Sequence, residues 1–242
     1  MKFRSRSLLI ALPALALSAS PAFASPGPNP AVGWDDLWFH VLVDIFAIGI
    51  VFAIGAVYMM VRYRSRGPGE VGRAPRLTRG QALAWALVPT AIFVADDFYL
   101  AGKGWSLFEV YRNPPADAME VKVTGYQWYW EFDYGNGVVK QELKVPVGKA
   151  VVLRMIGSDV VHSFALTDFR VKEDVMPGRV TYLWFRADKP IKTQVTCTMY
   201  CGLNHSRMFA PVEAVPPEQF HAWLDDQTRL AHAAAGNGHN KI

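Results

Sequence analysis

Four side chains that bind soft metals lie within twelve residues near the C-terminal end of the chain. In chain order they are Cys197, Cys201, His205 and Met208. Thiolate and thioether ligands select copper, zinc or iron–sulfur clusters, and imidazole suits copper and zinc. The types and the spacing of these residues therefore predict a metal site.

A local disulfide and a structural zinc site are the alternatives to copper. A Cys-x3-Cys disulfide is chemically possible in an exported chain, but it would close a very small loop, and the S–S bond has strict torsional requirements. A structural zinc site takes four nitrogen or sulfur ligands, commonly in two pairs. Here a thioether stands where zinc would take a thiolate or an imidazole, so the residues favour copper.

The second cysteine separates this loop from that of a mononuclear cupredoxin, which needs one Cys, two His and a weak Met. Two thiolates can instead bridge two copper ions, which then share one unpaired electron. The second histidine must come from elsewhere in the chain.

The loop closely resembles that of subunit II of the haem-copper cytochrome c oxidases, whose dinuclear CuA centre uses a Cys-x3-Cys-x3-His-x2-Met motif. Residues 158–164 are similar to the family's Asp-Val-x-His-Ser motif, and His162 in it supplies the missing histidine. Residues 169–172 and 176–179 look like the connection that follows in the family, and Trp85 with Pro89 resembles the Trp-x3-Pro of its second helix. The resemblance thus covers both apolar segments and the whole C-terminal domain.

The resemblance implies a dinuclear copper centre with six ligands. These would be two bridging thiolates, one histidine for each copper, a weak axial thioether and a backbone carbonyl: Cys197 and Cys201, His162 and His205, Met208, and the carbonyl of Met199. The family usually has Glu at position 199, where its carboxylate helps to hold a magnesium ion at the boundary with subunit I. Magnesium demands hard oxygen ligands in octahedral geometry, so Met199 predicts that this magnesium site is lost.

The aromatic run at residues 125–130 looks like the family's aromatic surface motif. Tyr and Trp are also ordinary strand formers and core fillers, but the resemblance makes Trp128 the exposed point where electrons enter from a soluble donor such as cytochrome c. Acidic docking residues would surround it, and the candidates are Glu131, Asp133, Glu142 and Asp159. Residues 105–242 carry 15 Lys+Arg and 15 Asp+Glu, so long-range steering of a basic donor would be modest.

The N-terminus has the three parts of a secretory signal peptide. Residues 1–6 are positively charged, residues 8–17 are apolar, and residues 22–24 form an Ala-x-Ala cleavage site. We predict a signal peptide at residues 1–24 and a periplasmic segment at 25–36; a retained signal anchor is the alternative.

Two apolar runs are long enough to cross a membrane. Residues 37–61 reach about 37 Å at 1.5 Å per residue, and the second run covers about residues 81–100. Six arginines crowd the loop at residues 62–80, which the positive-inside rule makes cytoplasmic. We therefore predict a transmembrane helix hairpin over residues 37–102 in the bacterial inner membrane, with the rest of the chain in the periplasm. Because topology explains the basic residues, no nucleic-acid partner is expected.

Acidic residues interrupt both apolar runs. Asp44 is expected to face a protein partner or the interface, and Asp96 and Asp97 are expected to lie near the outer interface as a surface pair. In many family members a Glu three residues before the Trp of Trp-x3-Pro opens a proton channel into subunit I. Here that position is Ala82, so the usual channel opening is absent or moved.

After residue 103 the pattern changes to short β-like runs separated by turn residues. This alternation predicts a Greek-key β-sandwich, and the resemblance makes it a cupredoxin-like β-barrel over residues 103–215. Residues 216–242 are predicted to form a helix, with an apolar stripe that includes Phe220 and Trp223, followed by a loose tail. The fold class is therefore a membrane-anchored all-β protein.

The predicted function is electron transfer from cytochrome c or a similar soluble donor to a haem-copper subunit I, which would reduce O2 to water. The chain lacks the axial histidines of a haem site in a membrane helix, so the chemistry at oxygen would occur in that partner. A copper-containing subunit of a nitric oxide reductase of the same superfamily is one alternative. A periplasmic copper chaperone is an alternative of another class. A quinol oxidase subunit II would have lost the metal ligands that are present here.

Overall fold

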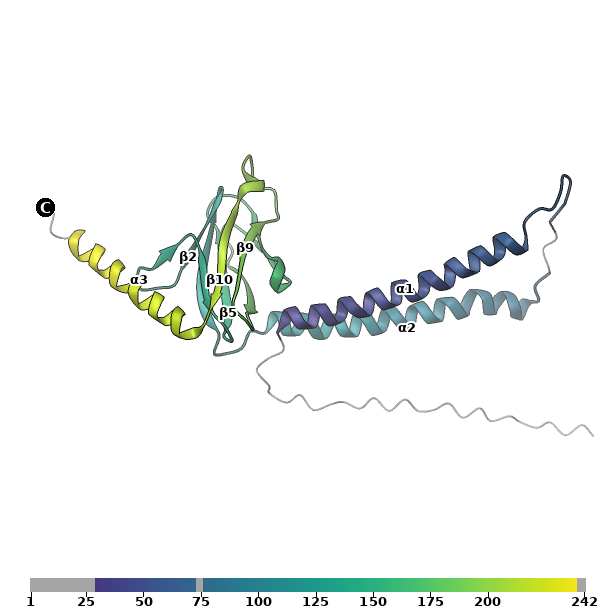
Figure 1. The fold of residues 1–242 in the computed structure, drawn as a ribbon, viewed down its shortest axis with the longest axis horizontal. Coiled ribbons are helices and arrows are strands. Elements are labelled where there is room, and N and C mark those ends of the chain that lie inside the picture. The colour runs from purple at the N-terminus through teal and green to yellow at the C-terminus, as the bar shows by residue number, and fades with distance from the viewer. Residues whose placement is uncertain (1–28, 73–75, 239–242) are drawn as a thin grey trace, which may run out of the picture.

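Two long helices and a β domain make up most of the structure, a computed structural model that describes residues 29–72 and 76–238 (Figure 1). The predicted signal peptide at residues 1–24 lies outside the described residues. The helices are α1 (Pro30–Arg62) and α2 (Arg79–Arg112), and they lie side by side with the β domain at one end and their connecting loop at the other (Figure 1). The predicted helix hairpin is thereby confirmed.

Both helices begin at capping residues that the sequence provides. The side chain of Asn29 accepts a hydrogen bond from the N–H of Ala31, and Pro30 occupies the first helical position, where its missing N–H costs nothing. Thr78 and Gln81 form a capping box at the start of α2. The first helix starts seven residues before the predicted apolar run, because these caps lie ahead of it.

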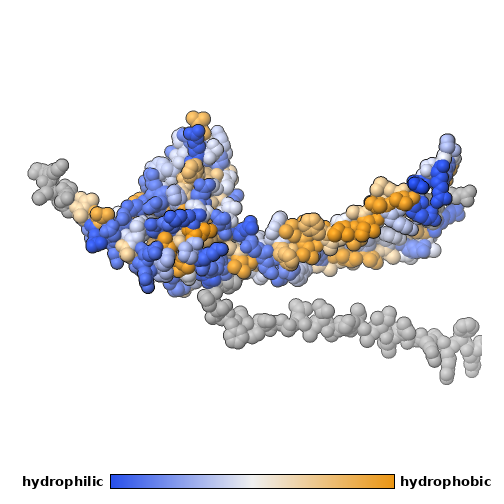
Figure 2. Space-filling view, viewed as in Figure 1, coloured by the Kyte–Doolittle hydropathy of each residue, from blue (hydrophilic) through white to orange (hydrophobic). Residues whose placement is uncertain are grey.

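The hairpin presents an apolar surface to its surroundings. Within the described residues both helices are long and apolar enough to cross a membrane, and the most apolar segment of each helix is exposed. Apolar side chains cover the middle of the hairpin, and hydrophilic ones gather at the loop end (Figure 2). Such a surface is stable only in a bilayer or against another protein chain.

A polar seam runs between the two helices near the β domain. The side chain of Asp96 on α2 lies close enough to Asp44 on α1 for the two carboxylates to interact. Further toward the domain, Asp36 interacts with His40 and lies 3.5 Å from the Nζ atom of Lys103. Asp96 therefore faces the other helix, and the expected surface pair with Asp97 describes only part of its surroundings.

The β domain consists of two five-stranded sheets that pack face to face. The first sheet has the order β3 (Val139–Lys140), β2 (Tyr129–Asp133), β1 (Met119–Tyr126), β5 (Ala150–Gly157), β8 (Thr181–Arg186). The second has the order β4 (Leu143–Pro146), β10 (Phe209–Val215), β9 (Ile191–Cys197), β6 (His162–Leu166), β7 (Val171–Val175). The predicted β-sandwich is confirmed.

Two strand pairs differ from a purely antiparallel sandwich. β1 runs parallel to β5, and β4 runs parallel to β10, whereas the other pairs are antiparallel. The chain leaves the first sheet after β3, forms β4 in the second sheet and returns as β5, so β1 and β5 meet through a crossover.

Aromatic side chains fill the space between the sheets next to the predicted metal ligands. The ring of Phe164 on β6 contacts Trp130 and Phe132 on β2, with ring centroids 5.1 and 6.2 Å apart. All three side chains are fully buried. This packing joins the strand that begins with His162 to the opposite sheet.

The C-terminal helix α3 (Pro217–Gly238) packs along the edge of the domain. Phe220 is buried, and Trp223 contacts Tyr134 at a centroid distance of 5.2 Å. The Nζ atom of Lys144 lies 5.3 Å from the centre of the Trp223 ring. The helix continues through residues 231–238, where a loose tail was predicted, and the four alanines among residues 231–235 have high helix propensity.

Hydrogen bonds join the hairpin rigidly to the domain. The Trp184 indole donates to the carbonyl of Val110 at 3.0 Å, and the Tyr182 hydroxyl donates to the carbonyl of Arg112 at 3.0 Å. The Arg112 guanidinium also binds the Glu173 carboxylate at 2.7 Å. α2 therefore passes directly into the domain without a flexible linker.

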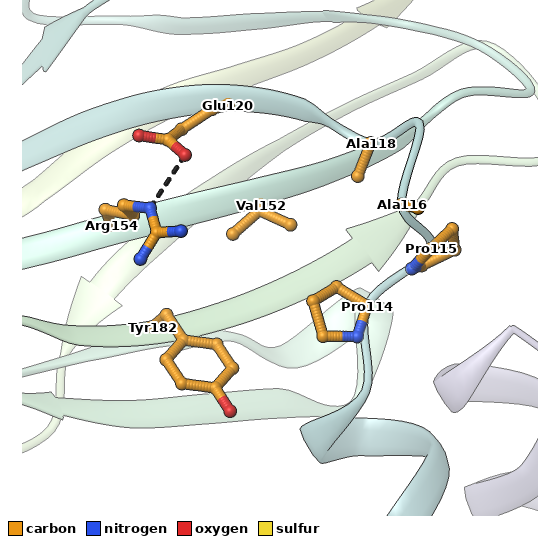
Figure 3. Close-up of a pocket in the computed structure, with 8 residues that line it drawn as sticks. All are labelled: Pro114, Pro115, Ala116, Ala118, Glu120, Val152, Arg154 and Tyr182. Atoms are coloured by element: carbon orange, nitrogen blue, oxygen red, sulfur yellow. Dashed lines mark hydrogen bonds and ion pairs between the residues drawn. The ribbon is translucent and has the colours of Figure 1, made fainter.

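A pocket of about 290 Å³ lies where the chain leaves α2 and enters β1 (Figure 3). Arg154 crosses one side of it with an ion pair to Glu120 at 2.7 Å. The other lining residues are Pro114, Pro115, Ala116, Ala118, Val152 and Tyr182. This pocket lies at the start of β1, whereas the predicted metal ligands gather near the end of that strand.

Candidate metal centre

Three neighbouring strands of the second sheet bring the predicted ligands to one edge. His162 is the first residue of β6, Cys197 is the last residue of β9, and Met208 immediately precedes β10. β6 and β10 both run antiparallel to β9, so their starts meet the end of β9. Antiparallel pairing thus joins residues that are 46 positions apart in the sequence.

Backbone hydrogen bonds hold both ends of the ligand loop, residues 198–208. The N–H of Cys197 donates to the carbonyl of Met208 at 3.0 Å, and the N–H of Thr198 donates to the carbonyl of Ser163 at 3.0 Å. A 3₁₀ turn at His205–Arg207 closes the loop before β10. The protein backbone therefore sets the shape of the loop.

The middle of the ligand loop contacts the turn between β1 and β2. The Gln127 side-chain amide donates to the carbonyl of Cys201 at 2.6 Å. Gly202 has a φ of 121°, and a Cβ there would lie 2.9 Å from Gln127 Nε2. Glycine is needed here because of both its backbone conformation and this close approach.

Six donor atoms gather at this edge of the sheet. The two cysteine sulfurs are 3.8 Å apart, and both cysteines are free thiols. The other distances are 4.0 Å from Cys197 Sγ to His162 Nδ1, 3.6 Å from Cys201 Sγ to His205 Nδ1, 3.6 Å from Cys201 Sγ to Met208 Sδ, and 3.2 Å from Cys197 Sγ to the carbonyl oxygen of Met199. The structure thus brings together all six predicted ligands.

These distances fit shared metal ions. In well-characterised zinc sites the metal lies about 2.3 Å from a thiolate sulfur and about 2.0 Å from an imidazole nitrogen. Two sulfurs can therefore bind one ion when they are closer than about 4.6 Å, and a sulfur and a nitrogen when they are closer than about 4.3 Å. The 3.8 Å between the sulfurs and the longer of the two sulfur–nitrogen distances, 4.0 Å, satisfy these limits.

The two thiols have opposite electrostatic environments. Burial raises the pKa of Cys197, but its contacts with His162 and with the backbone at Ser163 outweigh burial and bring that pKa below its usual value. Burial also raises the pKa of Cys201, and the neighbouring charge of Cys197 raises it further. A bound cation would stabilise both sulfurs as thiolates.

Asp159 holds the buried ring of His162. Its Oδ1 atom lies 2.8 Å from His162 Nε2, and its carboxylate accepts hydrogen bonds from the N–H groups of Gln127 and Val160 at 2.7 and 2.6 Å. Burial raises the pKa of Asp159, but these hydrogen bonds outweigh burial and lower it. An Nε2–H donated to Asp159 leaves Nδ1 as the metal-binding atom on the side of Cys197.

Sequence reasoning assigned Asp159 only to donor docking and did not foresee this contact. The sequence does show that Asp159 precedes His162 by three residues, and this spacing could have suggested the contact. The hydrogen bond from Gln127 could not be foreseen, because only the fold brings that residue close to Asp159. The carboxylate–histidine arrangement is a common support of metal-binding histidines.

Trp128 lies beside the ligand loop and is partly buried. A Cβ on Gly202 would lie 3.3 Å from Trp128 Nε1, so the indole lies against the loop backbone next to Cys201. The sequence predicted an exposed tryptophan, but this packing covers part of the ring. Two neighbours in the loop are more exposed: Tyr200 at 77% and Leu203 at 86%.

The other predicted docking residues lie on and beside β2. Glu131 and Asp133 share one face of that strand with Tyr129. Lys122 is the cross-strand partner of Asp133, so a basic residue adjoins this part of the acidic group. Glu142 is exposed in the segment before β4.

The structure combines a membrane-type helix hairpin with a β-sandwich, and two buried thiols and two histidines gather at one edge of that sandwich. This combination is typical of a membrane-anchored metalloprotein. The His162, Cys197 and Cys201 donor atoms lie within 4.8 Å of one another.

Comparison with known proteins identifies the family. Residues 138–215 match the family model described as cytochrome C oxidase subunit II, periplasmic domain. Cytochrome c oxidase subunit 2 of Cereibacter sphaeroides is 31% identical over 76% of this chain and 73% of its own length. The alternative cytochrome c oxidase subunit 2 of Bradyrhizobium diazoefficiens is 27% identical over 86% of both chains. The crystal structure of the periplasmic domain of subunit II of cytochrome oxidase from Bradyrhizobium japonicum is 31% identical, covers 48% of this chain and 98% of its own, and has a TM-score of 0.45.

The chain belongs to the cytochrome c oxidase subunit II family. It is a membrane-anchored, electron-transfer subunit of an oxidoreductase complex of the haem-copper oxidase type. Other oxidase subunits are therefore its partners.

Proposed function

We propose that the chain holds a dinuclear copper centre of the CuA type, which accepts single electrons from cytochrome c or a similar soluble donor. The electrons then pass to subunit I, where O2 is reduced to water. The observation that supports this proposal best is the pair of buried cysteine sulfurs 3.8 Å apart, with an imidazole nitrogen within 4.0 Å of each. When bound, two copper ions bridged by thiolates share one unpaired electron and so spread each redox change over many bonds.

Each ligand has a distinct role in this proposal. The thiolates of Cys197 and Cys201 would hold both copper ions, and each histidine would bind one of them, His162 on the side of Cys197 and His205 on the side of Cys201. The other two ligands are the weak axial thioether of Met208 and the carbonyl of Met199. With a thioether side chain at position 199, we propose no magnesium ion there.

The surrounding residues keep this geometry constant during redox cycles. Gly125 allows the rings of Trp130 and His162 to approach, because a Cβ there would lie only 3.0 and 3.1 Å from them. His162 is fully buried, and Asp159 contacts the Nε2 atom of its ring, opposite the proposed metal-binding atom Nδ1. Rigid ligands in a shielded site keep the reorganisation small, which favours fast electron transfer.

The proposed orientation places residues 1–24 in a cleaved signal peptide, the loop at 62–80 in the cytoplasm and the domain at 103–215 in the periplasm of a bacterial cell. Six arginines in the loop support it. Trp128, next to the ligand loop, is the proposed point where electrons enter, with Glu131, Asp133 and Glu142 as docking residues around it.

The copper content of the isolated chain tests the proposal. We expect the full chain, purified in detergent and loaded with copper, to bind two copper ions with a purple colour and a delocalised paramagnetic spectrum. Metal analysis together with electron paramagnetic resonance measures both properties. A single copper ion with a blue-copper spectrum would contradict the dinuclear centre.

Replacing Asp159 by asparagine should weaken copper binding without removing the site. The amide keeps the size of the side chain but loses the charge that supports His162, and loss of such a support typically lowers metal affinity 10–100-fold. Competition with a copper chelator measures the affinity. The matched control is Glu131→Gln, which removes an acidic group from the same surface and should leave copper affinity unchanged. Equal affinities in the two variants would mean that Asp159 serves docking alone.

A further inference from the structure

A cavity of about 320 Å³ lies between the start of α1 and the 3₁₀ turn that precedes β7. Three of its lining residues come from α1, namely Trp34, Asp35 and Trp38, and the fourth is Arg170. The cavity is thus formed by a membrane helix on one side and by the β domain on the other.

Hydrogen bonds and close helix packing fix the backbone at the start of α1, beside the cavity. Asn29, at the start of α1, donates hydrogen bonds to the carbonyl of Arg186 and to the carboxylate of Asp188 at 3.0 and 2.8 Å. One helical turn later, a Cβ on Gly33 would lie 2.6 Å from Leu107 Cδ1, so α1 and α2 pack closely there. The cavity is therefore preformed and does not depend on a mobile loop.

Arg170 occupies an unusual backbone conformation for its residue type. Its φ and ψ are 56° and 27°, in the left-handed region where glycine and asparagine are normally found. Such residues concentrate at ligand-binding sites. Its Nε atom lies 3.1 Å from Asp35 Oδ1, and a guanidinium has four further N–H donors.

The cavity lies at the depth of the lipid headgroups. Trp38 and Trp34 are 24 and 28 residues before Arg62 at the other end of α1, which is about 36 and 42 Å along the helix. The hydrocarbon core is about 30 Å thick, and the headgroup layers extend the bilayer to about 40–45 Å. With Arg62 at the inner edge of the hydrocarbon core, the outer headgroup layer extends from about 30 Å to about 35–37 Å along the helix. The Trp38 indole therefore lies in this layer, where tryptophan is enriched, and Trp34 lies just outside it on the side of the β domain.

We propose that this cavity binds the headgroup of a zwitterionic phospholipid of the outer leaflet. A guanidinium binds phosphate through paired hydrogen bonds, and indole faces attract an ammonium group. Asp35 binds the Nε side of the guanidinium and leaves its two terminal NH2 groups for the phosphate. The four residues thus match a ligand that carries a phosphate and an ammonium group a few ångströms apart, such as phosphatidylethanolamine. The proposal uses the orientation of the hairpin and is independent of the copper centre.

Native mass spectrometry of the purified oxidase complex that contains this chain tests the proposal. The complex is exchanged into detergent with phosphatidylethanolamine, and the bound lipids are counted. We expect Arg170→Gly and Trp38→Leu to retain one phosphatidylethanolamine fewer than the wild type. Glycine suits the backbone at position 170, so the first variant keeps its fold. Trp105→Leu, a matched control, replaces an exposed tryptophan of α2 outside the cavity and should retain the wild-type number.

Two further arms identify the chemistry of the ligand. Exchange into phosphatidylglycerol, which lacks the ammonium group, should reduce occupancy of this site at least tenfold, and excess inorganic phosphate should not displace the lipid. Equal lipid counts in the wild type and both cavity variants would overturn the proposal and would mean that another subunit covers the cavity. Equal occupancy by phosphatidylglycerol, or displacement by phosphate, would also overturn it. Copper content, measured on the same samples, should be unchanged.

Discussion

Cys201→Ser should abolish the delocalised copper spectrum that we propose for this chain. Cys201 Sγ lies 3.8 Å from Cys197 Sγ and 3.6 Å from both His205 Nδ1 and Met208 Sδ, so it contacts three of the other five donors. A serine hydroxyl is a hard ligand that copper does not prefer to a thiolate. Loss of this bridge should leave either no copper or a single copper ion, as measured by metal analysis and electron paramagnetic resonance.

A matched substitution separates loss of a bridge from general damage to the site. Met208 is fully buried, and leucine has a similar volume, so Met208→Leu should cost less than about 1.5 kcal/mol of stability. We expect this variant to keep two copper ions and to shift the reduction potential, because only a weak axial ligand is lost. Cys197→Ser should behave like Cys201→Ser. A serine variant of either cysteine that retained the delocalised spectrum would contradict bridging thiolates.

Trp128→Ala should slow electron transfer from reduced donor by orders of magnitude while copper content stays intact. The indole lies against Gly202, and the adjacent Gln127 side chain binds the carbonyl of Cys201. The substitution should therefore remove the proposed route to the sulfur ligands and leave the ligands in place. Rapid mixing of copper-loaded oxidase with reduced cytochrome c measures the rate.

Tyr129 provides the control for this experiment. It is the next residue in the chain, it is exposed, and its ring stacks on Tyr126 with centroids 4.8 Å apart. We expect Tyr129→Leu to reduce the rate far less than Trp128→Ala, because the ring of Tyr129 packs on Tyr126 rather than on Gly202. Similar rates in the wild type and the Trp128 variant would show that electrons enter elsewhere, with exposed Tyr200 and Leu203 as the next surface to examine.

The cluster of donor residues was predictable because its information is local. Four donors fall within twelve residues, and resemblance to the family supplied His162 through a motif of five residues. The hairpin was predictable for a similar reason, since apolar length and clustered arginines are properties of single segments.

The contacts that support the site depend on long-range packing and were not predictable. Asp159 meets both His162 and the backbone of Gln127, which precedes it by 32 residues. The parallel pairing of β1 with β5 and the contact between Asp44 and Asp96 likewise depend on which elements become neighbours. Periodicity shows which face of an element is buried, but it does not show what covers that face.

The continuous passage from α2 into the β domain has a consequence for the timing of electron transfer. Trp184, Tyr182 and Glu173 bind the last turn of that helix, and these contacts should restrict swinging of the domain relative to the hairpin. Domains on flexible linkers sample many separations from their partners, and tunnelling rates fall steeply with separation. A domain fastened in this way holds one tunnelling distance, so each electron should leave it with the same rate constant in every turnover.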